Sequence, residues 1–405
     1  MDPDPLADVV SGQYERWSYP APIEDLPDWL RTHWEWFDPS HSHRLLWPDR
    51  DYPSGLDILV AGCGTNQAAV IAYTNPSAHV VGIDVSTTSL GHQRRLAQTH
   101  GLGNLDLHHL PIEEAGALGR DFDLIITTGV LHHLADPAAG MRSLASLLRR
   151  DAVLAVMLYG VHGRIGVQLL QSVFRDLGLT QNDFSVSLVR RALAAVGDDH
   201  PVASYLPLAP DLVEDAGIVD TFLHGRERAY TIDECRELVT SAGLEFMDLF
   251  LRAPYYAPRS TGNEFLDLVS MLPRELQWSV MERVSTRNAC HFFMACRADR
   301  PRQAYEIDFA SGDPMRFVPA LRHACRHEGM VLRRFDDWPM VLDADQASLV
   351  SLIDGLRSIK QIIEVAGRSG VLANVGSRQT QGMVVDLFES LWRLDLAAMG
   401  LPPHT

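Results

Sequence analysis

Two glycines around a cysteine, Gly62-Cys63-Gly64, directly follow an apolar run that ends at Ala61. Glycines allow a sharp turn and let the main chain come close to a ligand, because no Cβ stands in the way. The amides that begin the next helix would face the same ligand. A second apolar run, from His79 to Ile83, ends in Asp84. A carboxylate at the tip of the neighbouring strand can accept hydrogen bonds from the two hydroxyls of a ribose. This spacing predicts a site for an adenosine-containing cofactor.

The glycine pattern is incomplete on its own. A full GxGxxG motif would have a third glycine where this chain has Gln67, and the absence of a following Gly-Lys-Ser/Thr sequence excludes a phosphate-binding P-loop. The pattern alone therefore also fits a strand, a turn and a helix whose glycines serve only the turn. The next hundred residues favour the ligand-binding interpretation.

The elements that must position these residues alternate regularly. From Leu56 to Gly160, strand-like and helix-like runs follow one another, which indicates a parallel sheet covered by helices on both faces. Ligand sites in such sheets lie at the carboxyl ends of the strands. The glycine turn and Asp84 both fall at such ends.

The chain from Gln13 to Arg297 resembles the class I S-adenosylmethionine-dependent methyltransferases, of the bacterial type with a GCGT sequence. The segments that carry the resemblance are VAGCGTNQ, VVGIDVS, LPIEEAGAL, FDLIITTGVLHHLADP and AVLAVMLYG, with QYERWSYP before them. The resemblance implies an α/β fold with a Rossmann-like seven-stranded sheet and helical insertions. It also implies S-adenosyl-L-methionine as the cofactor, S-adenosyl-L-homocysteine as its product, and methyl transfer by direct displacement.

The same resemblance assigns the cofactor-binding residues. The glycine turn passes beneath the cofactor, Asp84 binds the ribose, Val85 packs on the adenine, and Ile112 or Glu113 lies near the adenine edge. The full expected set is Tyr14, Gly62, Cys63, Gly64, Asn66, Gln67, Asp84, Val85, Ile112, Glu113, Gly129 and Leu131. The chain departs from the family pattern at Val60, where an acidic residue is usual, and at Asn66, where a third glycine is usual. Other groups must therefore hold the ammonium of the cofactor's methionine end.

Candidates for the acceptor side follow the fourth and fifth expected strands. His132, His133 and Tyr159 are the expected catalytic residues, and each also has an interpretation as a packing or capping residue. His162, Arg164 and Tyr230 are the expected substrate contacts, although loop flexibility and solvated charge explain this region equally well. The displacement requires close alignment and exclusion of water, with a base for the acceptor proton. It requires no metal, and none is expected.

Composition limits the protein's class. The 405 residues suffice for two or three domains. The chain has five cysteines and no CxxC pair, which indicates reduced thiols and not a zinc site or a set of structural disulfides. The chain has no long apolar run and no signal-like N-terminus, so we expect no membrane span and a cytoplasmic location, with unconventional export left open. A formal charge of −17 disfavours nucleic acid as a partner and favours a basic protein or peptide.

The pattern along the chain predicts five segments. They are an N-terminal helical cap rich in Trp and Tyr (1–52), the cofactor-binding core (53–160), a helical insertion (161–235), strands six and seven (236–300) and a C-terminal module (305–405). The C-terminal module resembles small α+β winged-helix domains of the PqqD-like type, although a packing or dimerisation module fits as well. The apolar stripe from Ile165 to Leu177 and this module could each support a homodimer, which we expect.

The sequence does not identify the methyl acceptor. The acidic charge, the insertions and the peptide-docking appearance of the tail favour a lysine amine on a basic protein, such as a histone-like protein. The alternatives are a small-molecule O-methyltransferase acting on a lipid, saccharide or secondary metabolite, and a non-catalytic cofactor-binding scaffold. The Asn/Asp-Pro-Pro-Tyr/Phe motif of base and glutamine methylation is absent after strand four, where the chain reads TTGVLHHL.

Overall fold

The computed structural model describes residues 5–257, 262–310, 312–335, 339–370, 372 and 375–402. The chain forms two compact units. The first comprises Met1–Phe37, Ser54–Phe246 and Glu282–Asp299, and the second comprises Asp38–Pro53, Met247–Met281 and Arg300–Thr405. The units cut across the expected segments, because residues 1–37 of the expected N-terminal cap belong to one unit and residues 38–52 to the other.

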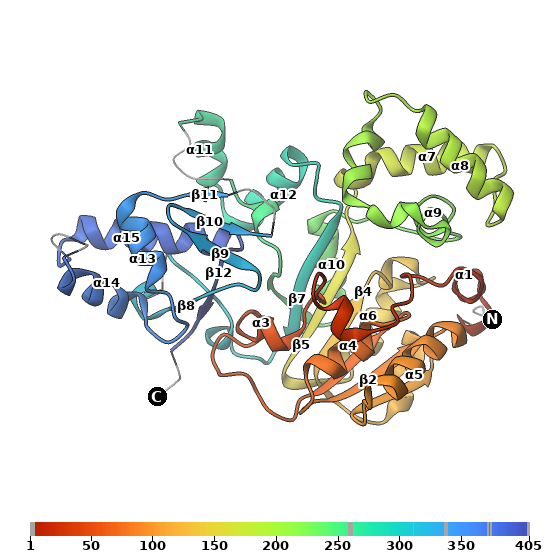
Figure 1. The fold of residues 1–405 in the computed structure, drawn as a ribbon, viewed down its shortest axis with the longest axis horizontal. Helices are drawn as coiled ribbons and strands as arrows, with labels where there is room; N and C mark the ends of the chain where they lie inside the picture. The colour runs from red at the N-terminus through yellow and green to blue at the C-terminus, as the bar shows by residue number, and fades with distance from the viewer. Residues whose placement is uncertain are drawn as a thin grey trace. The chain divides into compact units, whose positions relative to one another are not determined.

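A seven-stranded sheet organises the first unit (Figure 1). Its strands run in the order β3-β2-β1-β4-β5-β7-β6, and β7 is antiparallel to β5. The bounds are β1 (Asp57–Ala61), β2 (His79–Asp84), β3 (Leu105–His109), β4 (Phe122–Thr128), β5 (Leu148–Tyr159), β6 (Leu244–Leu249) and β7 (Cys290–Arg297). The central parallel strands β1, β2 and β4 are mostly apolar and buried, whereas the edge strand β3 is polar and partly exposed. This confirms the expected Rossmann-like α/β fold.

Four of the described helices cover the sheet. They are α4 (Gln67–Thr74), α5 (Thr87–His100), α6 (Pro137–Ala145) and α10 (Ile232–Ser241), of which α4 contacts α5 and α6 contacts α10. Helices α5, α6 and α10 begin with side-chain caps. The Ser86 hydroxyl accepts from the Ser89 amide at the start of α5, and Thr231 and Glu234 form a capping box at the start of α10. Short 3-10 turns, η2 (Ile112–Leu118) and η3 (Leu131–His133), follow β3 and β4.

Two segments outside the sheet complete this unit. The N-terminal helices α1 (Val9–Arg16) and α2 (Leu26–Trp29) come before β1. The insertion after β5 contains α7 (Ile165–Asp176), α8 (Asp183–Ala195) and α9 (Asp215–Phe222) around its own apolar core. The helical pattern expected from Val161 to Ala195 is broken into two helices, because Gly178 adopts a positive φ of 68° just after α7. The stripe of Ile165, Leu169, Val173 and Leu177 is solvent-exposed, and the homodimer expected from it stays a prediction.

The second unit holds the small sheets of the C-terminal region. β8 (Val318–Leu321) pairs with β12 (Ala397–Gly400), and β9 (Cys325–Glu328), β10 (Val331–Arg334) and β11 (Met340–Val341) form a three-stranded sheet. Its helices are α3 (Pro39–Leu46), α11 (Glu264–Ser270), α13 (Ala344–Ser351), α14 (Ile359–Arg368) and α15 (Arg378–Arg393), while α12 (Arg274–Val284) crosses the division between the units. Buried ion pairs join Asp395 to Arg322 and Arg252. The winged-helix resemblance of this region stays a prediction.

None of the described helices combines the length and the apolar character that a membrane crossing requires.

Candidate active site

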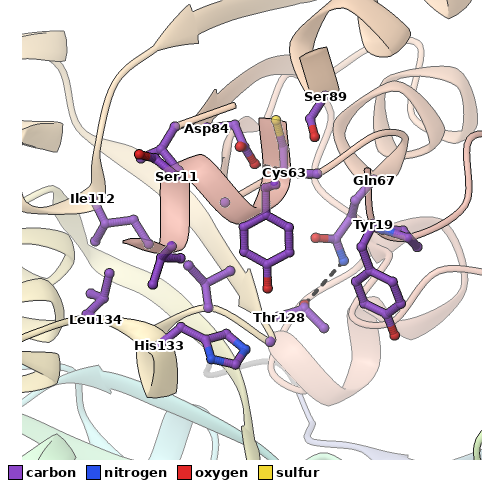
Figure 2. Close-up of a pocket in the computed structure, with 18 of the residues that line it drawn as sticks. Ser11, Tyr19, Cys63, Gln67, Asp84, Ser89, Ile112, Thr128, His133 and Leu134 are labelled. Atoms are coloured by element: carbon purple, nitrogen blue, oxygen red, sulfur yellow. Dashed lines mark hydrogen bonds between the residues drawn. The ribbon is translucent and has the colours of Figure 1, made fainter. Parts of the chain in front are cut away.

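A cavity of about 340 Å³ lies at the carboxyl ends of the parallel strands in the first unit (Figure 2). The turn after β1, the tip of β2 and the segment after β4 contribute to its lining, together with Tyr159 at the end of β5. Helix α1 and helix α9 supply Tyr14 and Asp220 from outside the sheet. The cavity therefore lies where the strand pattern predicted a ligand site.

The turn after β1 requires glycine at Gly62. Its φ is 74°, and a Cβ there would lie 2.3 Å from a methyl of Val130. Gly64 has a φ of 55°, and its Cβ would lie 3.2 Å from Pro20. Side chains at either position would be strained by the backbone conformation. At Gly62, a side chain would also displace the segment that follows β4.

Asp84 is fixed by the main chain around it. Its carboxylate accepts from the Gly64 amide at 2.8 Å and from the Ser86 amide at 2.9 Å. Burial raises the pKa of Asp84, and these amide hydrogen bonds act in the opposite direction because they stabilise the ionised form. A carboxylate has about four acceptor positions, and the amides of Gly64, Ser86 and Val85 donate to Asp84, so the carboxylate retains acceptor capacity for a ribose hydroxyl. This geometry fits an adenosine-containing cofactor.

Most of the expected cofactor contacts line this cavity. Those that do are Tyr14, Gly62, Cys63, Gly64, Asn66, Gln67, Asp84, Val85, Ile112, Glu113 and Gly129. Leu131 is the exception: it is fully buried and packs beneath α6, where a Cβ on Gly140 would lie 3.1 Å from its side chain. Leu131 was expected at the site because it follows β4 in the sequence, but its side chain points into the core.

Asp220 of α9 lines the cavity and joins two tyrosines, Tyr14 and Tyr159. The Tyr14 hydroxyl donates to one carboxylate oxygen at 2.8 Å, and the Tyr159 hydroxyl donates to the other at 3.1 Å. Burial raises the pKa of Asp220 and raises the pKa of both tyrosines well above the ordinary value. The tyrosines therefore stay protonated and act as donors at neutral pH.

His133 has one ring nitrogen available for chemistry. Its Nδ1 lies 2.9 Å from the carbonyl oxygen of Arg226. A carbonyl only accepts, so Nδ1 carries the hydrogen and Nε2 carries the lone pair. In the described part of the chain Nε2 has no hydrogen-bond partner. Burial lowers the pKa of His133, while Asp220 acts in the opposite direction, so the ring is neutral at neutral pH and Nε2 can accept a proton.

His132 differs from its neighbour. It does not line the cavity, its ring stacks on Tyr159 with centroids 4.0 Å apart, and its Nδ1 accepts from the Tyr159 amide at 3.3 Å. Burial lowers the pKa of His132 well below the ordinary value. The structure thus places this expected catalytic residue as packing beneath Tyr159, in agreement with its alternative interpretation.

The three expected substrate contacts lie outside the cavity. Arg164 is fully buried, pairs with Glu227 at 2.8 Å and lies over the Tyr159 ring at 3.7 Å, so it supports Tyr159 instead of meeting a substrate directly. Tyr230 is buried at a bridge to Gly160. His162 lies 3.9 Å from Glu282. These residues therefore support the structure around the site and do not line the cavity.

His133, Asp220 and His224 also meet the distance requirement of a metal site, because one ligand atom of each lies within 4.8 Å of the others. The two imidazole rings, however, stack at 3.7 Å with an interplanar angle of 15°. A metal lies close to the plane of each imidazole that binds it through a nitrogen lone pair, and two stacked, nearly parallel planes share no such position. This arrangement suits proton transfer, and the expectation of no metal stays a prediction.

Sequence reasoning missed Asp220 and His224. Both lie on or just after α9, inside the insertion, where no motif marks them. An aspartate inside an apolar helix segment, GIVDTF, is the one local signal that could have drawn attention to Asp220.

Comparison with known proteins agrees with this geometry. Residues 53–178 match a family model described as a methyltransferase domain. This part of the chain is a class I S-adenosylmethionine-dependent methyltransferase domain. The methyltransferase is thus an enzyme by class, with S-adenosyl-L-methionine as its cofactor.

The methyltransferase also has relatives over longer or shorter parts of its length. It is 25% identical over 341 residues to an uncharacterized protein of Synechococcus, covering 80% of this chain and 78% of that protein. It is 32% identical to the tRNA 5-carboxymethoxyuridine methyltransferase of Escherichia coli (29% of this chain, 48% of that protein). It is 31% identical to a ubiquinone biosynthesis O-methyltransferase of Aromatoleum aromaticum (32% of this chain, 58% of that protein). The chain thus spans about half the length of these two enzymes.

A solved structure is similar over nearly the whole methyltransferase. PKMT2 from Rickettsia typhi, in complex with AdoHcy, matches 90% of this chain and 75% of its own with a TM-score of 0.65 and 14% identity. At this identity the likeness shows the fold alone.

Proposed function

We infer that the methyltransferase transfers a methyl group to the side-chain amine of a lysine in a basic protein. The observation that carries this proposal is the buried carboxylate of Asp220, which faces the cavity between the hydroxyls of Tyr14 and Tyr159. No ion pair to Asp220 occurs among the described residues. A lysine ammonium is the complementary charge.

The surroundings of Asp220 favour a cation over a neutral acceptor. Aromatic side chains, Tyr14, Tyr19, Trp36 and Tyr159, line the cavity together with His133. Aromatic faces attract an ammonium, and a buried carboxylate gains most from a partner of opposite charge. A neutral hydroxyl would offer Asp220 only a hydrogen bond.

The size of the cavity favours a narrow acceptor. Its 340 Å³ is near the lower end of ligand pockets, which hold about 300–1,000 Å³. A cofactor fills most of such a volume, so the acceptor must enter as a thin extension. A lysine side chain is such an extension, because its amine sits at the end of four methylene groups.

The chemistry assigns distinct tasks to the residues. S-adenosyl-L-methionine supplies an electrophilic methyl group when it is bound. Asp220 attracts and orients the incoming ammonium, and His133 Nε2 accepts one of its protons, which leaves a neutral amine with a lone pair for attack. Asp220 then stabilises the imidazolium of His133, since its charge raises the pKa of that ring. Tyr14 and Tyr159 hold the carboxylate in place.

Two wider features support a protein substrate. The formal charge of −17 favours encounter with a basic partner at low ionic strength. The fold that this chain shares with PKMT2 extends well beyond residues 53–178. The relatives that modify tRNA or ubiquinone precursors match only about 30% of the chain.

A labelling screen tests the proposal. The methyltransferase is incubated with S-adenosylmethionine carrying a labelled methyl group, and either with basic proteins or with the same proteins whose lysines have been acetylated. We expect label in the unmodified proteins only, and less label with Asp220→Asn than with Asp215→Asn, a matched control at the exposed start of the same helix. Label that persists after acetylation would contradict a lysine acceptor.

The alternative is methylation of a hydroxyl on a small molecule. One observation favours it: His133 Nε2 can also act as the general base that a hydroxyl acceptor requires. The same screen, run with a pool of lipid, saccharide and secondary metabolites, separates the two candidates. Label in the metabolite pool and none in protein would favour this alternative.

A further inference from the structure

We propose that Glu35 binds the ammonium group at the methionine end of the cofactor and replaces the acidic residue that is missing at Val60. Val60 is apolar, fully buried in β1 and absent from the cavity lining. Glu35 lines the cavity although it precedes the sheet and lies outside residues 53–178. The N-terminal segment thus supplies, through Glu35, the negative charge that β1 lacks at Val60.

The orientation of the cofactor follows from the expected contacts on either side of Asp84. Figure 2 shows Ile112 and Leu134 at one side of the cavity and Gln67 at the other, with Asp84 and Cys63 between them. Ile112 belongs to the adenine end and Asp84 to the ribose. The amino-acid end therefore extends towards Gln67.

Glu35 is anchored at that end. Its carboxylate accepts from the side-chain amide of Gln67 at 3.0 Å, and the same amide nitrogen lies 3.2 Å from the hydroxyl oxygen of Thr128. Gln67 begins α4 and Thr128 ends β4, so Gln67 holds the carboxylate beside the start of α4 and the end of β4. The next residue, Trp36, packs on Phe292 of β7 with centroids 4.2 Å apart, which holds this segment against the sheet.

The other acidic side chains of the cavity have different tasks. Asp84 accepts from main-chain amides, Asp220 accepts from two tyrosines, and Asp8 forms an ion pair with Arg226. Glu113 follows Ile112 at the adenine end. Glu35 is the acidic side chain of the cavity lining that contacts Gln67. A carboxylate binds an ammonium through charge-assisted hydrogen bonds, which are about twice as strong as neutral ones.

Calorimetry with three ligands tests this assignment without any methyl acceptor. S-adenosylhomocysteine carries the ammonium and the carboxylate, its decarboxylated analogue keeps the amine alone, and 5′-methylthioadenosine lacks both. We expect Glu35→Gln to weaken binding of the first two by about 10- to 100-fold. Binding of 5′-methylthioadenosine should stay within about twofold, because it makes no contact with Glu35.

The controls distinguish a local effect from misfolding. Glu24→Gln changes an exposed carboxylate of the same N-terminal segment and should leave the affinity for all three ligands unchanged. An equal loss for all three ligands with Glu35→Gln, or no loss for S-adenosylhomocysteine, would overturn the assignment. Because no acceptor is present, either outcome is independent of the proposed lysine substrate.

Discussion

The two halves of the cavity are built in different ways. The cofactor half consists of the glycine turn, Asp84 and the residues near Ile112, and its key contacts are main-chain amides within about twenty residues of one another. The acceptor half consists of Tyr14, His133, Tyr159 and Asp220, which come from four separate elements and meet through side chains. Cofactor binding can thus be fixed by local backbone geometry, while the proposed acceptor contacts depend on long-range packing of side chains.

Substitutions in the two halves of the cavity should have different effects on the enzyme. Substitutions in the cofactor half should change the affinity for S-adenosylhomocysteine, whereas substitutions in the acceptor half should change the rate and its pH dependence. A variant that changes both would show that the halves are coupled.

The largest effect is expected at His133. His133→Asn removes the proton acceptor and should lower kcat/KM at neutral pH by about 10²- to 10⁴-fold, with little change in affinity for S-adenosylhomocysteine. In the unmodified enzyme the rate should fall only as the pH drops through the lowered pKa of His133, because the ring is neutral above it. In the variant this limb should disappear, and the rate should rise towards the pKa of a free lysine, about 10.4. A pH profile that is unchanged in the variant would remove His133 from the chemistry.

Gly62 should have the next largest effect, on folding. Gly62→Ala introduces a Cβ at a φ of 74° and against Val130, and it should lower the free energy of unfolding by about 2–4 kcal/mol. Adding Val130→Ala should recover part of the loss, since it removes the clashing methyls but not the backbone strain. Chemical denaturation of the single and double variants measures both terms. Equal stability of the two variants would show that strain alone matters.

Asp84 should affect binding and not the acid-base behaviour. Asp84→Asn keeps the shape but loses the charge, and it should weaken S-adenosylhomocysteine binding by about 1–3 kcal/mol. The pH profile of the remaining activity should match that of the unmodified enzyme. Calorimetry and a pH series measure the two effects. If the affinity does not change, Asp84 does not bind the ribose.

The smallest effect is expected at His132. His132→Asn keeps an acceptor for the Tyr159 amide but loses the stacking on the Tyr159 ring, which should cost about 1 kcal/mol of stability. Thermal unfolding measures this cost. The rate should change by less than about threefold, and a loss comparable to that of His133→Asn would assign His132 a catalytic role.

The difference between the halves also explains what the sequence could predict. The turn, the place of Asp84 at a strand end and the parallel sheet follow from local patterns, namely apolar runs and glycines, and these predictions agree with the structure. His133 and Tyr159, which the sequence proposed from their places after β4 and at the end of β5, both line the cavity. Asp220, His224 and Glu35 come from segments without a motif, and only the packing of α9 and the N-terminal segment brings them to the cavity. Leu131 and His132 are adjacent to the site in sequence, but the turn of η3 directs them into the core.

A peptide with one lysine, compared with the same peptide carrying 6-hydroxynorleucine at that position, tests the central claim most directly. The two differ only in an amine against a hydroxyl at the end of an identical chain. We predict methyl transfer to the lysine peptide, a large loss of that transfer with Asp220→Asn, and no transfer to the hydroxyl peptide. Equal or faster methylation of the hydroxyl peptide would contradict the account of Asp220 as the partner of an ammonium.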